Sequence, residues 1–325
     1  MEKMMKSGYV NHPQQLYTLR RVTVNEGKAK GTEIIEVCTA GGLQVDILPD
    51  AGMDIGQVRY KGVNVTFISK NGYDSPAAIM PYEGEFLNTF PGGLLYTSGL
   101  RTTGGAHRDG DEWQPFHGRH HSHLAEQICT EVVDDTVVIR GTVRETALFG
   151  HHLMLKRIIR IPVFGAQITV EDEMTNLTHS DQEYAILYHC NFGYPFISAD
   201  ARVELPEKRR TSPRNEFSAT GIGTESGFPE PTPGAGEMVF FHEDMKRTAA
   251  VVNEKLGIRM DMLWSETLPI MAQWRSTASG DYALGLEPTN CYILGRKAER
   301  EHGTLKVLKP FESVKTGVTI GFVDI

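Results

Sequence analysis

The chain has 325 residues, of which 40% are hydrophobic and 23% are charged, as in a globular protein with a substantial core. It has 33 Lys and Arg residues against 41 Asp and Glu residues, and its formal net charge is −8. This mild acidity argues against a nucleic-acid backbone as the main partner. Residues 1–19 are polar, and no apolar run in the chain is long enough to span a bilayer.

Four cysteines, Cys38, Cys129, Cys190 and Cys291, lie far apart and form no CxxC pair. Widely spaced single cysteines fit a reducing compartment, where thiols stay free. Because the N-terminus also lacks a secretory signal, we expect a cytoplasmic protein that does not insert into a membrane.

The first part of the chain predicts an antiparallel sheet. Alternating or apolar stretches are separated by Gly or Asn clusters, and they cover Leu16–Val24, Thr32–Thr39 and Leu43–Leu48. A turn at residues 49–52 follows, with Asp54 just before another short strand. Residues 75–87 are weakly helical and begin with a Ser-Pro pair.

A glycine-rich passage covers residues 90–105 and contains Arg101. Glycines at this density permit unusual backbone angles and the close approach of a ligand. They are equally compatible with irregular connections between short strands, and both interpretations stay open.

Five histidines follow within residues 106–123. In one interpretation His117, His121 and His123, with Glu126, bind a divalent metal as in cupin-type sugar isomerases. In the other, His117 alone reaches a pocket and hydrogen-bonds a hydroxyl group. The spacing matches no tight ligand motif, which favours the second interpretation.

The stretch from Tyr184 to Phe196 has the apolar, aromatic composition of a buried strand, and a turn stops it after residue 193. Alternation places His189 and Asn191 on one face. An unpaired buried polar group costs about 1–3 kcal/mol, so both side chains need partners or a ligand. A hydrogen-bonded structural histidine and a functional one remain equally open on this stretch alone.

Residues 206–236 contain five prolines and five glycines and show no apolar periodicity. We interpret them as a surface excursion, because long loops in compact domains are usually functional lids or linkers. The arginines at positions 209, 210 and 214 suit an anionic substrate, although a solvated charge cluster explains them as well.

The C-terminal third predicts further strands, among them Tyr282–Glu287. Ala283, Gly285 and Glu287 share one face of it, so small side chains lie behind a carboxylate and leave space for a ligand beside a base. An exposed glutamate at a strand end is the alternative. About eighteen short strands with little helix predict one all-β domain over residues 1–325, built as a large sandwich.

Nucleotide-cofactor and hydrolase motifs are missing from the sequence. No GxGxxG opens a helix after a strand, no GxxxxGK[ST] occurs, and there is no GxSxG elbow. A nucleotide cofactor is therefore unsupported, and we expect no cofactor. The spacing of the histidines and the positive charge of Arg119 among them argue against a bound metal.

Three short motifs occur in order in this all-β chain: Phe-His-Gly-Arg at 116–119, Tyr-His-Cys-Asn at 188–191 and Leu-Glu-Pro-Thr-Asn at 286–290. With their order and spacing, the chain resembles the galactose mutarotase-like superfamily of aldose 1-epimerases, over roughly residues 15–325. It is most similar to a poorly characterised bacterial branch. The resemblance implies an antiparallel β-supersandwich with few short helices and an open sugar-binding groove.

The resemblance also implies roles for site residues. Glu287 matches the general base, His189 the general acid, and His117 the second pocket histidine. Arg101 is the best match to an arginine that holds sugar hydroxyls, although its spacing and neighbours differ. Asp54 in Gly-Met-Asp-Ile-Gly is typical of the branch.

Asn191 and Trp274 complete the predicted substrate-binding set, with Trp274 either stacking on a sugar face or packing in the core. The implied activity is interconversion of sugar anomers, or epimerisation of a related sugar, by acid–base ring opening. The expected partner is a small sugar, with acidic and phosphorylated sugars left open, and the chain is expected to be a monomer or homodimer. A metal-dependent keto-sugar isomerase and a non-catalytic carbohydrate-binding protein are the alternatives.

Overall fold

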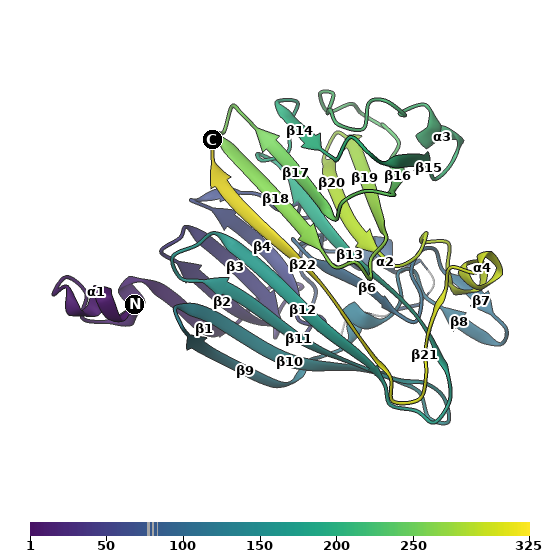
Figure 1. Cartoon of the computed structure of the whole chain (residues 1–325), viewed down its shortest axis with the longest axis horizontal. Coiled ribbons are helices and arrows are strands. Elements are labelled where there is room, and N and C mark those ends of the chain that lie inside the picture. Colours follow the sequence, from purple (N-terminus) through teal and green to yellow (C-terminus); the bar gives the residue numbers. More distant parts are fainter. Residues whose placement is uncertain (77–78, 80, 83) are drawn as a thin grey trace.

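The structure is a computed structural model that describes residues 1–76, 79, 81–82 and 84–325. Over these residues the chain is built almost entirely of antiparallel strands (Figure 1). The predicted helix at 75–87 falls partly on residues outside the description, and the short helix α2 begins only at Phe86.

The first sheet contains the predicted N-terminal strands in sequence order. Its members are β1 (Tyr17–Thr23), β2 (Glu33–Thr39), β3 (Leu43–Leu48), β4 (Asp54–Tyr60) and β5 (Val63–Asn64). Inward-facing residues of β2 to β4 are fully buried, because alternate side chains of each strand point to the core.

A second, longer sheet runs across the molecule. In spatial order its strands are β14 (Ala201–Glu204), β17 (Thr248–Asn253), β18 (Ile258–Trp264), β22 (Ser313–Asp324), β12 (Gln167–Asn176), β11 (His152–Pro162), β10 (Thr136–Thr146) and β9 (Glu126–Val133). The C-terminal β22 lies between β18 and β12, so it joins the later strands to the middle of the chain.

The third sheet holds the two strands that carry the predicted acid and base. In spatial order it consists of β15 (Arg210–Pro213), β16 (Met238–Glu243), β19 (Ile270–Ala278), β20 (Asp281–Thr289), β13 (Gln182–Gly193) and β21 (Lys306–Leu308), with β6 (Tyr96–Leu100) also paired to β13. The strand β13 ends at Gly193, as its sequence predicts.

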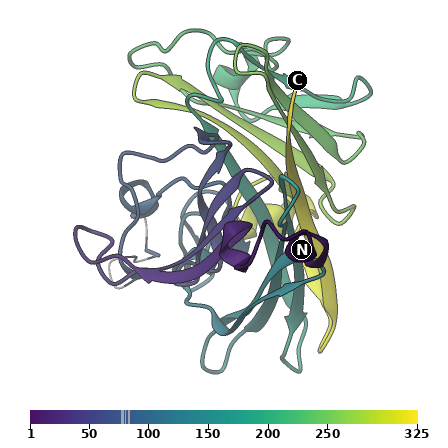
Figure 2. The ribbon, with the colours of Figure 1, turned by 90° about the vertical axis from the view of Figure 1, so that its left-hand side faces the viewer.

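The remaining elements are short. Among the described residues they are the hairpin of β7 (His107–Asp109) and β8 (Glu112–Gln114), the helices α1 (Glu2–Lys6), α2 (Phe86–Thr89), α3 (Glu216–Ala219) and α4 (Arg296–His302), and the 3-10 helices η1 (Pro13–Gln15) and η3 (His120–Ser122). Figure 1 shows α1 projecting away from the strands, and Figure 2 shows the later strands stacked over the earlier sheets. None of the described helices is long and apolar enough to cross a membrane.

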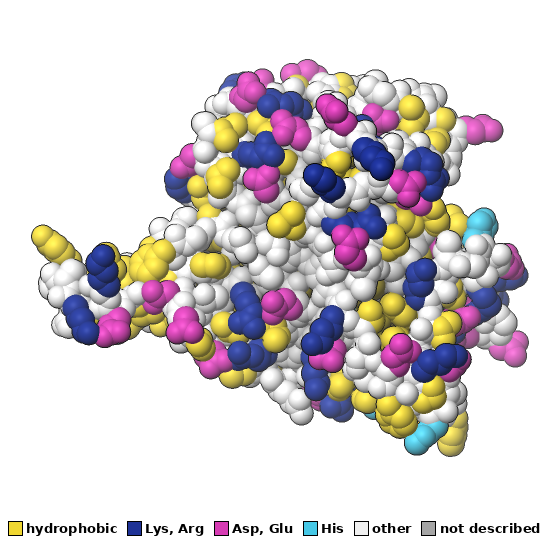
Figure 3. Space-filling model, viewed as in Figure 1, with side chains coloured by type: hydrophobic (Ala, Val, Ile, Leu, Met, Phe, Trp, Pro, Cys, Tyr) yellow, Lys and Arg dark blue, Asp and Glu magenta, His cyan; other side chains and the backbone are white. Residues whose placement is uncertain are grey.

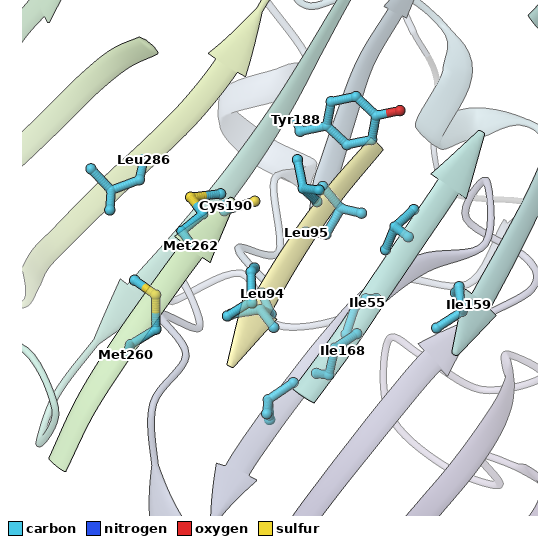
Figure 4. Packing of buried hydrophobic residues seen from close by; sticks show 14 of the residues in the cluster. Ile55, Leu94, Leu95, Ile159, Ile168, Tyr188, Cys190, Met260, Met262 and Leu286 are labelled. Atoms are coloured by element: carbon cyan, nitrogen blue, oxygen red, sulfur yellow. The ribbon is translucent and has the colours of Figure 1, made fainter. Parts of the chain in front are cut away.

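The core gathers side chains from all three sheets. In Figure 4, Tyr188 and Cys190 of β13 and Leu286 of β20 pack with Met260 and Met262 of β18. On the face shown in Figure 3, basic and acidic side chains are interspersed over the surface.

The sequence did not predict six of the described strands. β5 has only two residues, and β7 and β8 lie in the segment at 106–123 that contains the histidines. β6 lies inside the glycine-rich passage, and β14 and β15 lie around the start of the proline-rich stretch. Each has at most five residues, which is too few to show a period. The surface excursion at 206–236 therefore includes β15 and the helix α3.

Candidate active site

Strand β13 presents two different faces. The Tyr188 hydroxyl donates a hydrogen bond to Asp172 on the core side, at 2.7 Å. His189 points to the opposite side, as alternation requires. There it faces β20, which pairs with β13 through Asn191 opposite Gly285.

His189 and Glu287 meet on this face. The imidazole Nε2 lies 3.2 Å from the carboxylate Oε1, and the residues are 6% and 2% exposed. The two atoms approach without an aligned hydrogen bond, since Glu287 Oε1 has no hydrogen-bond partner among the described residues. His189 Nδ1 is buried and unpartnered in the same way. The structure thus brings together the two residues that the sequence predicts as acid and base.

Burial shifts the pKa values of the two groups in opposite directions, because it disfavours both charged forms. Burial and then the negative charge of Glu237 raise the pKa of Glu287 well above its usual range, against a smaller lowering by Arg214. Burial lowers the pKa of His189 to about 4, although Asn191 and Glu237 act against this shift. At neutral pH burial therefore favours a neutral imidazole, not the protonated histidine that acid catalysis requires.

His117 completes a group of three ionisable residues. Its ring centroid lies 5.7 Å from that of His189, with the two planes almost perpendicular. The backbone N–H of Gly104 donates to His117 Nδ1 at 3.3 Å, so the neutral ring carries its proton on Nε2. Burial, then His189 and Arg214, hold the pKa of His117 well below its usual value. A neutral His117 can donate a hydrogen bond to a sugar oxygen through Nε2.

Aromatic rings surround His189. Trp274 lies with its ring centroid 5.6 Å away and Phe90 with its centroid at 5.5 Å. Trp274 is partly exposed and pairs with Gly285 in the β19–β20 register. Trp274 also packs against a small buried cluster of Val239, Phe241, Ile270 and Ala272, so stacking on a sugar remains a prediction beside its packing role.

Gly285 explains why the strand face carries small residues. A Cβ atom at this position would lie 2.2 Å from Glu287 Oε1 and 3.1 Å from the Trp274 Cβ. The carboxylate therefore occupies the space that a side chain would fill. The spacing of Ala283, Gly285 and Glu287 predicts space for a ligand beside the carboxylate, whereas over Gly285 the carboxylate itself takes up that space.

Two residues at the edge of this site are missing from the predicted set. Arg214 donates to Glu237 at 2.6 Å, and Trp274 Nε1 donates to the other carboxylate oxygen of Glu237 at 2.9 Å. Both charges influence the buried group: Glu237 raises and Arg214 lowers the pKa of Glu287. Arg214 was noted only as one of three loop arginines, and no motif marks Glu237.

Asn191 lies within the site but is already engaged. It is fully buried, and its Nδ2 donates to the backbone carbonyls of Gly93 and His189 at 3.0 and 2.9 Å. Its Oδ1 is buried without a partner in the described part of the chain. The Asn191 side chain therefore links two backbone segments and raises the pKa of His189. Only its Oδ1 remains available for the predicted contact with substrate.

Asp54 does not fit the predicted substrate-binding role. It is fully buried, and its oxygens accept hydrogen bonds from Thr97, His121 and Arg157. Burial opposes ionisation, but the hydrogen bond from His121 and the charge of Arg157 keep the pKa of Asp54 below its usual value. Because protein donors surround this carboxylate, we assign it a structural role.

Arg101 lies at the other end of β6 from the acid–base pair. The start of β6, at Tyr96, pairs with His189, whereas its end, at residue 100, pairs with Ala185. Arg101 follows that end and forms an ion pair with Glu112. Its sugar-binding role remains a prediction, and its observed contact is to Glu112.

The histidine cluster is dispersed. His121 Nδ1 bonds Asp54 at 2.7 Å, and His120 Nε2 lies 3.0 Å from the carbonyl oxygen of Gly52. Among the described residues, no three His, Cys, Asp or Glu side chains are grouped as metal ligands. The alternative metal site at His117, His121 and His123 therefore gains no support from this geometry.

Solved structures resemble this chain along nearly its whole length. A "putative aldose 1-epimerase" from Klebsiella pneumoniae matches with a TM-score of 0.89 at 24% identity, over 95% of this chain and 84% of that one. A galactose mutarotase-like protein from Clostridium acetobutylicum gives 0.66 at 16% identity, over 96% and 100%. A galactose 1-epimerase from Lactobacillus acidophilus gives 0.64 at 14% identity, over 94% and 99%.

Sequence comparisons add the family. A search of curated proteins gave no match. A family described as "Domain of unknown function (DUF4432)" matches residues 29–322. The predicted resemblance and the predicted β-supersandwich are thereby confirmed: the chain belongs to the DUF4432 family and has the fold of the galactose mutarotase-like proteins.

Proposed function

We propose that this protein is an aldose 1-epimerase-like isomerase that interconverts the anomers of a sugar, or epimerises a related one, by acid–base ring opening. The observation that carries the proposal is the buried His189–Glu287 contact at 3.2 Å, in which both residues keep an unpartnered polar atom. Unpartnered buried polar atoms cost free energy, and a bound polar ligand would recover it.

The short separation suits this chemistry. Opening a cyclic hemiacetal removes a proton from the anomeric hydroxyl and delivers one to the ring oxygen. Both oxygens are bonded to the same carbon, so one acid and one base must lie side by side. Glu287 takes the proton from the hydroxyl, His189 gives its proton to the ring oxygen, and His117 steadies a neighbouring oxygen.

The reaction needs one proton shared by the pair. Ring closure on the other face runs with the roles exchanged, so the pair ends with the proton count it started with. Burial favours placing this proton on Glu287. Hydrogen bonds from sugar hydroxyls stabilise the Glu287 carboxylate, so the neutral carboxylic acid gives up its proton, which passes to His189 across the 3.2 Å contact.

NMR exchange spectroscopy on a panel of aldoses, ketoses, uronic acids and sugar phosphates tests the proposal. The wild-type protein is expected to accelerate anomer exchange of at least one of them. Glu287→Gln keeps the size of the side chain and is expected to lower the rate by about 10²–10⁴-fold. We expect a comparable loss for His189→Ala and a smaller one for His117→Ala.

Glu266→Gln is a matched control, because the Glu266 side chain is 87% exposed and pairs only with Arg247 among its described neighbours. It is expected to keep full activity. Near-full activity of Glu287→Gln would rule out the assigned base. Sugar binding without any acceleration of exchange would show a carbohydrate-binding protein on this scaffold.

A further inference from the structure

A second pocket lies at the end of β13 and β20 where Tyr194 and Gly280 are found. Its volume is about 470 Å³, and its lining includes Asn64, Phe67, Tyr194, Glu230 and Tyr282. Ligand pockets in proteins usually measure about 300–1,000 Å³, so this one can hold a small molecule. His189 and Glu287 are not part of its lining.

Phe67 connects this pocket with the active site. Its ring centroid lies 6.0 Å from that of Trp274, which in turn lies 5.6 Å from His189. A Cβ atom at Gly193 would lie 2.6 Å from the Phe67 Cα, so the Phe67 backbone packs against β13. The pairing is in the plane of the sheet, because Thr66 lies opposite Phe192 and the Phe67 N–H donates to the Asn191 carbonyl at 3.2 Å. Phe67 is therefore opposite Asn191, and its side chain lies on the face that carries His189 and Asn191. A row of aromatic rings thus leads from the acid–base pair to the pocket.

The long excursion at 206–236 forms one wall. Glu230 and Pro231 line the pocket, and the backbone carbonyl of Pro229 accepts a hydrogen bond from the Tyr282 hydroxyl at 2.6 Å. A further backbone bond, from Thr232 N–H to the Thr277 carbonyl at 2.9 Å, fixes the segment to β19. The excursion is therefore tied to the third sheet next to the pocket.

The lining chemistry selects a neutral, hydroxyl-rich ligand. Aromatic rings offer flat apolar surfaces for the C–H face of a sugar. Gln57 and Asn64 supply amide groups, and among the described lining residues Glu230 alone is charged. A phosphate or carboxylate on the ligand would meet that carboxylate with no described cation in the lining.

We propose that this pocket is a second sugar subsite, which binds the neutral sugar unit attached to the reducing sugar at Glu287. The substrates would then include reducing disaccharides or longer oligosaccharides. This inference rests on the proposed function, because it places the reducing ring at the acid–base pair.

Two variants test the subsite without touching the acid–base pair. Tyr194→Ala removes an aromatic side chain that is 73% exposed, and Ala199→Trp fills the pocket from an exposed position. A strong aromatic contact, at the upper end of the usual range of interaction energies, corresponds to about a tenfold change in rate. We therefore expect kcat/KM for a reducing disaccharide to fall about tenfold or more, and the value for the corresponding monosaccharide to stay unchanged.

Tyr9→Ala is the control for Tyr194→Ala, because Tyr9 is 88% exposed and belongs to the N-terminal segment. It is expected to leave both activities unchanged. Circular dichroism establishes that each variant is folded. Equal effects of the variants on monosaccharide and disaccharide, or no effect on either, would overturn the subsite.

Saturation-transfer NMR with the same disaccharide separates this inference from the proposed function. If no sugar is isomerised, the proposed function fails. Disaccharide binding that Ala199→Trp abolishes would still support the subsite. Binding that this variant leaves intact, or no binding at all, would contradict it.

Discussion

Two buried clusters of ionisable side chains lie on opposite sides of β13 and differ in how completely their polar atoms are hydrogen-bonded. On the core side, Arg157 donates to both oxygens of Asp172, at 2.9 and 2.7 Å, and to Asp54 at 2.8 Å. Tyr188 donates to the same Asp172. On the other side, Glu287 Oε1 and His189 Nδ1 have no hydrogen-bond partner in the described part of the chain.

The difference suits a structural role for the first cluster and the proposed catalytic role for the second. Arg157 comes from the long second sheet and Asp54 from the first sheet, while Tyr188 belongs to the third. A fully paired network can therefore hold the three sheets in one arrangement. An incompletely paired group has atoms left for a ligand, and in this molecule that group is the His189–Glu287 pair.

The largest expected effect comes from breaking the paired network. Arg157→Leu leaves the buried carboxylates of Asp54 and Asp172 without their cation. Removing one partner of a buried ion pair costs about 3–5 kcal/mol. The free energy of unfolding, measured by urea denaturation, is expected to fall by this amount.

Arg160→Leu provides the comparison, because Arg160 lies in the same strand and pairs with Glu171 at the surface, at 3.0 Å. An exposed pair of this kind contributes about 0–1 kcal/mol. Similar losses of stability in the two variants would show that the buried network is not the structural element we infer.

A smaller expected effect comes from crowding the unpaired group. Gly285→Ala places a methyl group where Glu287 Oε1 lies, so the carboxylate must move. Misplacing a catalytic group by about 1 Å can cost about 10²-fold in rate. We expect kcat for anomer exchange to fall by about this factor while the unfolding midpoint changes little.

Gly321→Ala is the matched control in another strand, since the nearest atom to its added Cβ, the Ala166 carbonyl oxygen, lies 3.9 Å away. It is expected to leave activity unchanged. An unaltered rate for Gly285→Ala would mean that the exact carboxylate position does not matter for the reaction.

The smallest expected effect is on the pH profile. Below the pKa of His189, at about 4, both members of the pair are protonated and no base remains. Above the raised pKa of Glu287 the pair has lost its proton and no acid remains. Activity should therefore persist well below pH 6.5, fall near pH 4 and fall again on the alkaline side.

Asn191→Ala sharpens this result. The Asn191 side chain raises the pKa of His189, so its removal should move the acidic limb to lower pH. Rates are measured together with circular dichroism at each pH to exclude unfolding. An acidic limb near pH 6.5, unmoved by the substitution, would contradict the buried neutral histidine.

Alternation placed His189 and Glu287 on strand faces because both residues lie on long, regular strands, while the family resemblance supplied their proposed roles as acid and base. Period-2 alternation put His189 on one face of β13 and Glu287 on a face of small residues in β20. The structure then joined these faces through the β13–β20 register. The sequence analysis did not predict that Arg214 and Glu237 influence Glu287. Their position depends on how the proline-rich excursion packs, and no local periodicity encodes that packing.

Asp54 shows the opposite failure. A motif resemblance placed it among the substrate-binding residues, but its surroundings come from Thr97, His121 and Arg157, all distant in sequence. Whether a buried carboxylate is saturated or free depends on these long-range donors. The residues next to Asp54 in the sequence do not show how many such donors reach its carboxylate.

The sequence by itself determined the strand-rich class, the faces of the main strands and the residue types of the acid–base pair, because these follow from side-chain alternation and turn residues. Only the tertiary structure decided which polar groups are paired and which stay open. It also decided how Phe67 and Trp274 connect the pair to a second pocket. Pairing and pocket shape arise where separate strands meet, so they depend on packing between segments far apart in the chain.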